Sequence, residues 1–338
     1  MIKLVLACVA GVAVGVLVTL LATGSGSERK TRPEPQADRA PDAPESAQPE
    51  PEEAPAVETR APAPETPSIQ ESATLAWLRN LLPRRFDTLT LAQMRQLREL
   101  DLSGRNVDAA DLAQLKHLRS LSILKLGNTG IGDAELAHLK DLASLERLTL
   151  RGTRITDAGL GELTGLGKLR ELDLTATAVG DAGLVRLNGM ASLTELRLDR
   201  TKVTDAGLEG LRDLSLKAIT LGQTAVTDAG LGHLRRFKLE ELSIYRNTNI
   251  TDAGMSELAQ QTSLQKLMLR GVKITENGLS YLRNLKSLEV MNASMVVSDA
   301  GMKHIGELTA LKRLGLYSNP NITDAGAIHL QKLKSLEF

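Results

Sequence analysis

A unit of 23 to 25 residues recurs ten times between Leu97 and Phe338, and this periodicity constrains the fold more than any other feature. The units begin at Leu97, Leu121, Leu145, Leu169, Leu193, Leu216, Leu239, Leu264, Leu288 and Leu311. Repeats of this length form stacked arrays, because one unit is a single supersecondary element that cannot bury its own apolar face. The sequence therefore predicts a solenoid.

The unit at 145–167, LERLTLRGTRITDAGLGELTGLG, contains two different hydrophobic periods. Leu148 and Leu150 alternate with polar residues, as in a strand with one buried face. After the Thr-Asp-Ala-Gly segment, Leu160 and Leu163 are three residues apart, which is typical of a short helix. Each unit is thus predicted to be a strand followed by a helix.

Ten such units predict an α/β fold, a right-handed βα solenoid with a parallel strand ladder and helices outside. The pattern Leu-x-x-Leu-x-Leu-x-x-Thr-x-Ile-Thr-Asp-Ala-Gly-Leu resembles a leucine-rich repeat horseshoe, and its ITDAG segment is similar to the cysteine-containing subtype found beside F-box domains. The resemblance covers residues 97–338. It implies one candidate function, a substrate-recognition subunit of a ubiquitin-ligase-like complex.

The sequence departs from this subtype at position 9 of the unit, where Thr replaces the usual Cys or Asn. The residues are Thr129, Thr153, Thr177, Thr201 and Thr224, with Asn247 and Asn319 in two later units. A hydroxyl or amide here can bond backbone groups left unpaired between neighbouring repeats. We therefore expect a structural ladder at position 9.

An aspartate also recurs just before each predicted helix, at Asp133, Asp157, Asp181, Asp205, Asp228, Asp252, Asp299 and Asp324. Helix capping by the Thr or the Asp explains this position, since a carboxylate suits the positive end of a helix. Calcium needs six or more oxygens converging on one point, whereas each unit supplies one carboxylate. We predict capping and no metal site.

Residues 1–24 are predicted to be a transmembrane anchor or a signal peptide. Residues 4–22 contain no charge and are long enough to span a bilayer, which favours an anchor. Cleavage after the Ala22-Thr23-Gly24 region is the alternative. A Gly-x-x-x-Gly pair, Gly11 and Gly15, suggests self-association of helices as a further hypothesis.

The side of the membrane on which the repeats lie stays open at this stage. Three cations, Arg29, Lys30 and Arg32, follow the apolar run and favour a cytoplasmic repeat domain, whereas Lys3 precedes it. The signal-like amino terminus favours export. The repeat domain is predicted to be exported, periplasmic or extracellular, and the cytoplasmic orientation is retained as an alternative.

Two segments separate the apolar run from the repeats. Residues 25–71 contain ten of the twelve prolines with many Ala and Glu residues, which predicts a disordered linker that acts as a spacer. Residues 72–96 do not match the repeat, but Leu75, Leu78 and Leu81 recur at helical spacing beside Trp77. We predict that 72–96 is a helical cap, too short to be an F-box, and that 97–338 is the repeat domain.

Nothing in the sequence indicates catalysis, a cofactor or a nucleic-acid partner. All five histidines, His117, His138, His233, His304 and His329, fall in the helical halves of their units, and no motif brings a nucleophile and a base together. Residues 72–338 carry 30 acidic and 35 basic residues, and no basic stripe with aromatic residues accompanies this small excess. The chain is predicted to be non-enzymatic.

Protein binding is predicted on the concave face, which is formed by strand positions 2, 3, 5, 7 and 8. The later units place large side chains there, of the types enriched at interface hot spots. The predicted protein-binding residues are Tyr245, Arg246, Lys266, Met268, Arg270 and Tyr317.

We interpret the sequence as a membrane-tethered module that binds a protein ligand. The sequence given stops at Phe338, inside the first strand of an eleventh unit. A solenoid edge without a cap can pair with another chain. A structural role in surface or envelope assembly, or self-association through this edge, is therefore a further alternative to the ubiquitin-ligase role.

Overall fold

The computed structural model describes residues 68–294 and 297–337. The predicted anchor at 4–22, the cleavage region, the Gly11 and Gly15 pair and the linker up to residue 67 lie outside these residues. Within the two described ranges, every helix is too short or too polar to cross a bilayer.

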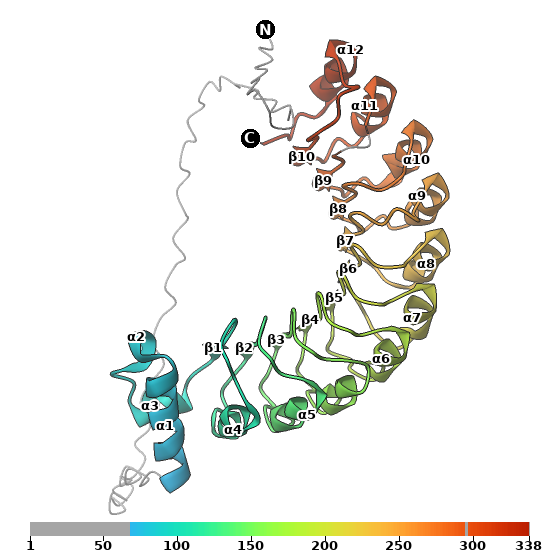
Figure 1. The fold of residues 1–338 in the computed structure, drawn as a ribbon. Coiled ribbons are helices and arrows are strands. Elements are labelled where there is room, and N and C mark those ends of the chain that lie inside the picture. Colours follow the sequence, from blue (N-terminus) through green and yellow to red (C-terminus); the bar gives the residue numbers. More distant parts are fainter. Residues whose placement is uncertain (1–67, 295–296, 338) are drawn as a thin grey trace, which may run out of the picture.

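The described chain forms one parallel sheet of ten strands that follow one another in sequence order. Figure 1 shows an open arc with the strands on its inner side and the helices on its outer side. The predicted leucine-rich-repeat type of solenoid is therefore confirmed in its parallel ladder and helical layer. The strands are β1 (Glu99–Asp101), β2 (Ile123–Lys125), β3 (Arg147–Thr149), β4 (Glu171–Asp173), β5 (Glu195–Arg197), β6 (Ala218–Thr220), β7 (Glu241–Ser243), β8 (Lys266–Met268), β9 (Val290–Asn292) and β10 (Arg313–Gly315).

The strand register places equivalent positions of successive repeats side by side. Leu124 pairs with Leu148, and Leu148 pairs with Leu172, so the position 4 leucines form one buried column. Successive side chains of a strand point to opposite faces. Positions 3 and 5 therefore line the concave face, where most of their side chains are partly or fully exposed.

Most helices on the outer side make one or two turns and begin directly after a Thr, Ser or Gly N-cap. They are α4 (Ala109–Ala113), α5 (Asp133–Leu136), α6 (Asp181–Arg186), α7 (Asp205–Gly210), α8 (Asp228–His233), α9 (Asp252–Leu258), α10 (Glu276–Tyr281), α11 (Asp299–Ile305) and α12 (Asp324–Ala327). Turns of 3-10 helix accompany them at η1 (Gln114–His117), η2 (Ala137–Leu139), η3 (Gly159–Leu163), η4 (Leu234–Arg236), η5 (Leu282–Asn284) and η6 (Ile328–Lys332). Short helices of this kind are stabilised by packing rather than by propensity.

Three helices precede the first strand: α1 (Ile69–Leu81), α2 (Pro83–Phe86) and α3 (Leu91–Arg95). Helix α1 begins three residues before the predicted boundary at 72, so residues 69–71 are helical and the prediction of linker there was wrong. The reason is a capping box, in which the Glu71 N–H donates to Ser68 Oγ over 3.1 Å and Glu71 accepts from the Ser68 N–H over 3.1 Å.

The helices before β1 are joined to the first repeat by polar side chains as well as by the core. Trp77 Nε1 donates to Asp111 Oδ1 over 2.7 Å, and Thr74 Oγ1 donates to Gln114 Oε1 over 2.9 Å. Leu78 is fully buried in the same core cluster as the repeat leucines. These contacts cover the open end of the sheet at β1.

A left-handed residue ends the concave segment in nearly every repeat. Position 8 has φ between 55° and 74° at Gly104, Asn128, Gly152, Ala176, Arg200, Gln223, Arg246, Gly271 and Ser318. This conformation is unfavourable for residues with a Cβ. The turn geometry, and not the local residue type, therefore determines where Arg246 is placed.

Candidate functional site

The recurring aspartates bond the next repeat rather than capping their own helices. The Thr204 hydroxyl accepts from the Ala206 N–H over 3.3 Å and so caps α7. Thr204 then donates its own N–H (2.8 Å) and its hydroxyl (2.7 Å) to the carboxylate of Asp181, one repeat earlier. Capping by Thr is confirmed, and the Asp lies in the first turn of its helix, where a carboxylate was expected. The Asp is not the capping group, however, because its carboxylate reaches the neighbouring unit.

The same pair of hydrogen bonds occurs at five other junctions: Asp133 with Thr156, Asp205 with Thr227, Asp228 with Thr251, Asp252 with Thr275, and Asp299 with Thr323. Gly180 has no hydroxyl, and it donates only its N–H to Asp157, over 2.6 Å. Apart from Asp324, each of the recurring carboxylates accepts a hydrogen bond from the next repeat. In the described ranges no three His, Cys, Asp or Glu side chains are grouped as metal ligands.

The position 9 residues fall into two classes. Thr153 Oγ1 donates to Leu150 O within its own repeat, over 2.5 Å, so the prediction that these hydroxyls bond between repeats was wrong. The amide of Asn247 does bond between repeats: Nδ2 donates to Leu221 O (2.8 Å), and Oδ1 accepts from the Thr224 N–H (3.0 Å). The longer amide reaches the preceding turn, whereas the hydroxyl does not.

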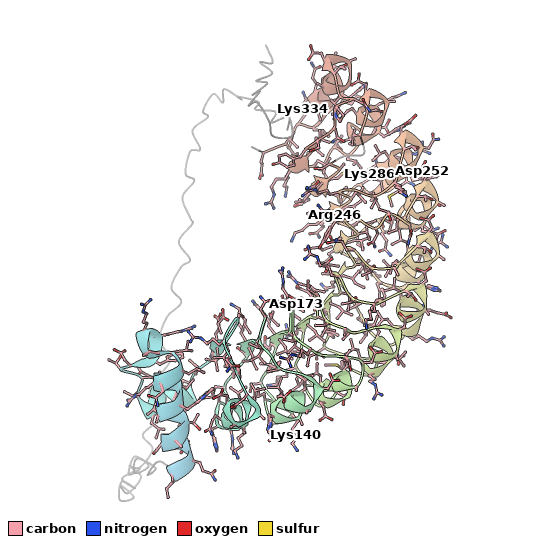
Figure 2. All side chains as sticks on the ribbon, in the orientation of Figure 1. Lys140, Asp173, Arg246, Asp252, Lys286 and Lys334 are labelled. Carbon is pink, nitrogen blue, oxygen red and sulfur yellow. The ribbon has the colours of Figure 1, made fainter. Side chains whose placement is uncertain are left out.

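Five of the six predicted binding residues lie on the adjacent repeats that contain β7 and β8: Tyr245, Arg246, Lys266, Met268 and Arg270. Lys266 pairs in register with Glu241 of β7, and their side chains form an ion pair of 3.1 Å. Arg246, whose backbone N–H donates to Arg270 O over 2.7 Å, points into the hollow of the arc (Figure 2). The structure thus brings these five together.

Tyr317 lies apart from them, three strands further along the sheet. At about 4.8 Å per strand this is on the order of 14 Å from Tyr245. Its side chain is 55 % exposed, and its backbone N–H donates to Ser294 Oγ over 3.1 Å. A ligand contacting both tyrosines must therefore cross β8 and β9.

Tyr245 is half-buried because its ring lies over the neighbouring repeat, against Gly222. A Cβ at Gly222 would overlap the ring, so glycine is required there by the close approach. Beneath it, Asp199 accepts from the Thr220 hydroxyl (2.5 Å) and from the Gly222 N–H (2.6 Å). Burial raises the pKa of the Asp199 carboxyl, and these hydrogen bonds oppose the rise. Tyr245 therefore has a structural role in addition to the predicted binding role.

Only some of the cations on the concave face are paired with an acid. On β3 to β5, Arg147 and Arg197 both lie beside Glu171, at 3.8 and 3.4 Å. Three late cations that also project from the concave face, Arg246, Arg270 and Arg313, have no hydrogen-bonded or ionic side-chain partner in the described part of the chain. These guanidinium groups are exposed and available to another molecule.

We call this surface the late concave face and define it by Tyr245, Arg246, Met268, Arg270, Arg313 and Tyr317. Arg313 was missed by the sequence reasoning, although it occupies position 3 of its repeat, as Lys266 does. Comparing position 3 across all repeats would have found it. Lys266 borders the late concave face but is neutralised by Glu241.

A shallow hollow of about 140 Å³ adjoins the late concave face at β6. It forms because Ala218 occupies position 3 between Glu195 and Glu241, its register neighbours on β5 and β7. Lys217 and Glu240, which form an ion pair of 2.9 Å, lie on its rim. The hollow is a depression in the concave surface, but most charged side chains that line it form ion pairs with each other, Lys217 with Glu240 and Lys266 with Glu241.

A model of the leucine-rich repeat region matches residues 81–338 of the chain. The chain belongs to the leucine-rich repeat family. The match is to the repeat region in general, and the F-box-associated subtype stays a prediction. A comparison with curated proteins found no match.

Similar solved structures include two leucine-rich repeat proteins of Listeria monocytogenes. An internalin, inlF, aligns with 20% identity and a TM-score of 0.46 over 78% of this chain and 94% of its own. Internalin C2 aligns with 20% identity and a TM-score of 0.44 over 82% of this chain and 98% of its own.

Proposed function

We propose that this leucine-rich repeat protein is a non-enzymatic protein-binding module whose ligand occupies the late concave face. One observation carries the proposal: Arg246, Arg270 and Arg313 project from neighbouring late repeats without a side-chain partner in the described residues, and Met268 and Tyr317 lie on the same surface. A surface that only needed solvation would not require the apolar Met268 and the exposed Tyr317 beside these cations.

The chemistry of this face favours an acidic protein surface as ligand. Arg and Tyr are enriched at interface hot spots because each combines a large contact area with a polar end. Guanidinium groups bind carboxylates through paired, charge-assisted hydrogen bonds. Complementary charge also raises the association rate and selects among partners. The ligand is therefore expected to contribute carboxylates to Arg246, Arg270 and Arg313.

The uncharged run at 4–22 supports a membrane tether for this module, with 25–67 as spacer and the repeats on the exported side. A protease applied to intact cells, with lysed cells as control, tests this arrangement. Removal of a carboxy-terminal tag only after every membrane is opened would place the repeats in the cytoplasm and contradict export.

The binding proposal is tested by affinity capture from the native cells, comparing wild type with Arg246→Ala/Arg270→Ala by quantitative mass spectrometry. Proteins bound at the late concave face are expected to be lost from the double variant. The matched control is Arg147→Ala/Arg197→Ala, which removes two cations from the same face but from the paired region, and it should retain them. Equal capture by both variants would contradict the proposal.

Tyr245→Ala is unsuitable for this test, although Tyr245 is one of the predicted binding residues. The Tyr245 ring covers Gly222, so truncation opens the surface above Asp199 and perturbs the fold as well as the face. The guanidinium groups of Arg246 and Arg270 form no hydrogen bond or ion pair with another described side chain, although the Arg246 Cγ lies over Gly271 of the next repeat. The unfolding midpoint of the double variant is therefore measured together with its binding.

A further inference from the structure

The late concave face and the adjoining Lys266 carry an excess of positive charge. Four cations, Arg246, Lys266, Arg270 and Arg313, extend from the repeats of β7, β8 and β10, and Glu241 is the anion that pairs with one of them. The other three charges are uncompensated among the described residues. Nearby exposed cations repel one another unless counter-ions or a ligand neutralise them.

The same chain contains a segment of opposite charge close before the repeats. Residues 41–53, PDAPESAQPEPEE, hold five carboxylates and no Lys, Arg or His. Four prolines lack the backbone N–H that strand pairing needs, so recognition of this segment would depend on its carboxylate side chains. The carboxylates are Asp42, Glu45, Glu50, Glu52 and Glu53.

The length of the intervening chain allows this segment to reach β7 and β8. Helix α1 has 13 residues and is about 20 Å long, and seven strand spacings from β1 to β8 add about 34 Å. A path along the surface from Ser68 is thus on the order of 54 Å. Residues 42 to 50 precede Ser68 by 26 to 18 positions, which span about 56 to 81 Å at 3.1 Å each.

We propose that, in the absence of a ligand, residues 41–53 of the chain bind to the late concave face through Asp42, Glu45 and Glu50. This inference rests on the proposed function, because the segment occupies the surface assigned to the ligand. An acidic partner then has to displace the segment. The segment acts as an intramolecular competitor, which lowers the apparent affinity for weak acidic ligands and leaves strong ones bound.

Zero-length carbodiimide coupling of the full-length protein tests the contact, since it joins an amine to a carboxylate only when the two touch. Peptide mapping is expected to show Lys266 joined to Asp42, Glu45 or Glu50. The Lys266 conjugate with Glu241 serves as the positive control, because these groups are 3.1 Å apart. Lys140, exposed on the outer side in Figure 2, should form no conjugate with the segment.

The charge requirement is tested by Asp42→Asn/Glu45→Gln/Glu50→Gln. The three new amides cannot react with an amine, so the readout is conjugation at the two unchanged carboxylates of the segment, Glu52 and Glu53. Wild-type protein is expected to give Lys266 conjugates with the neighbouring Glu52 or Glu53 as well, and these should be lost in the variant. The matched control, Asp38→Asn/Glu28→Gln/Glu34→Gln, removes the same number of carboxylates from before the segment and should keep the wild-type conjugates. Molar salt should abolish them in every form.

Three results would overturn the proposal: no Lys266 conjugate with the segment, equal conjugation of Lys140, or conjugates that join light and heavy isotopic copies in a mixture. The last would assign the contact to a second molecule. Arginine-dependent capture in the preceding experiment tests the binding surface separately. If partner proteins are captured but no Lys266 conjugate forms, only the intramolecular contact is rejected. If conjugates form but no partner depends on the arginines, only the proposed ligand binding is rejected.

Discussion

The Asp181 carboxylate accepts two hydrogen bonds from Thr204, one from the backbone N–H at 2.8 Å and one from the hydroxyl at 2.7 Å. The two residues belong to successive repeats, so the bond joins the outer halves of neighbouring units as the strand ladder joins their inner halves. Nearest-neighbour interfaces of this kind determine the stability of a solenoid.

Replacing Asp181 by Ala is expected to destabilise the repeat domain by about 2 kcal/mol, because a partly buried N–H and hydroxyl lose a charged acceptor. Urea denaturation followed by circular dichroism measures the change. Asp324→Ala is the matched control: Asp324 belongs to the same motif, but its carboxylate forms no hydrogen bond or ion pair with another described residue. Its effect should stay within about 0.5 kcal/mol, and equal losses in both variants would contradict the ladder interpretation.

Replacing Gly183 by Ala should also destabilise the domain, by about 1–3 kcal/mol. A Cβ at this position would lie 2.5 Å from Asp157 Oδ1 and 3.1 Å from Asp157 Cα. To relieve the overlap, the backbone of Asp157 in the preceding repeat would have to shift. The unfolding midpoint provides the measurement. Gly165→Ala, whose Cβ would meet nothing within 4 Å, should be neutral or slightly stabilising. A neutral Gly183→Ala would show that the junction can expand.

The fold was predictable because its signals are local and repeated. Leu148 and Leu150 show the strand period, and Leu160 and Leu163 show the helical one, within a single unit. The hydrogen-bond donor to the Asp181 carboxylate could not be predicted from the same sequence. A carboxylate at the start of a helix can bond that helix or the preceding or following unit, and only the stacking distance decides.

The candidate face was predictable in part for a similar reason. Tyr245 and Arg270 stand out at one position of the repeat, whereas the free state of Arg313 depends on which side chains lie on β9. Charge pairing across strands is set by register, which places Arg147 and Arg197 beside Glu171 and Lys266 beside Glu241, but leaves Arg246, Arg270 and Arg313 without an acid in the described residues. Sequence alone shows which charges exist, and the ladder determines which of them are paired.

Replacing Ala176 by Gly should stabilise the domain by about 1 kcal/mol, because Ala176 is exposed and has a φ of 56°. Thermal unfolding should show a higher midpoint. The same chemical change at Ala229, an exposed residue in the first turn of α8, should lower stability by about 1 kcal/mol through lost helix propensity. Two shifts of the same sign would contradict the conformational argument.

Asp199→Asn is expected to alter how stability depends on pH. Burial raises the pKa of the Asp199 carboxyl above its ordinary value of 3.8, so the folded protein binds this proton more tightly than the unfolded chain does. The contribution of the carboxyl is therefore fully present below pH 3.8 and is lost as pH rises through the raised pKa. The unfolding free energy of wild type minus that of Asp199→Asn should fall across this window and then become constant.

Asp299→Asn provides the comparison of opposite sign. Hydrogen bonds from the Thr323 hydroxyl and N–H lower the pKa of the Asp299 carboxyl below 3.8, so its contribution is present above that pH and is lost as pH falls through the lowered pKa. Urea denaturation from pH 2 to 7 should give a wild-type-minus-variant difference that rises with pH for Asp299 and falls for Asp199. A rising difference at both sites would mean that the hydrogen bonds from Thr220 and Gly222 outweigh the burial of Asp199, and the assigned cause of its pKa shift would be wrong.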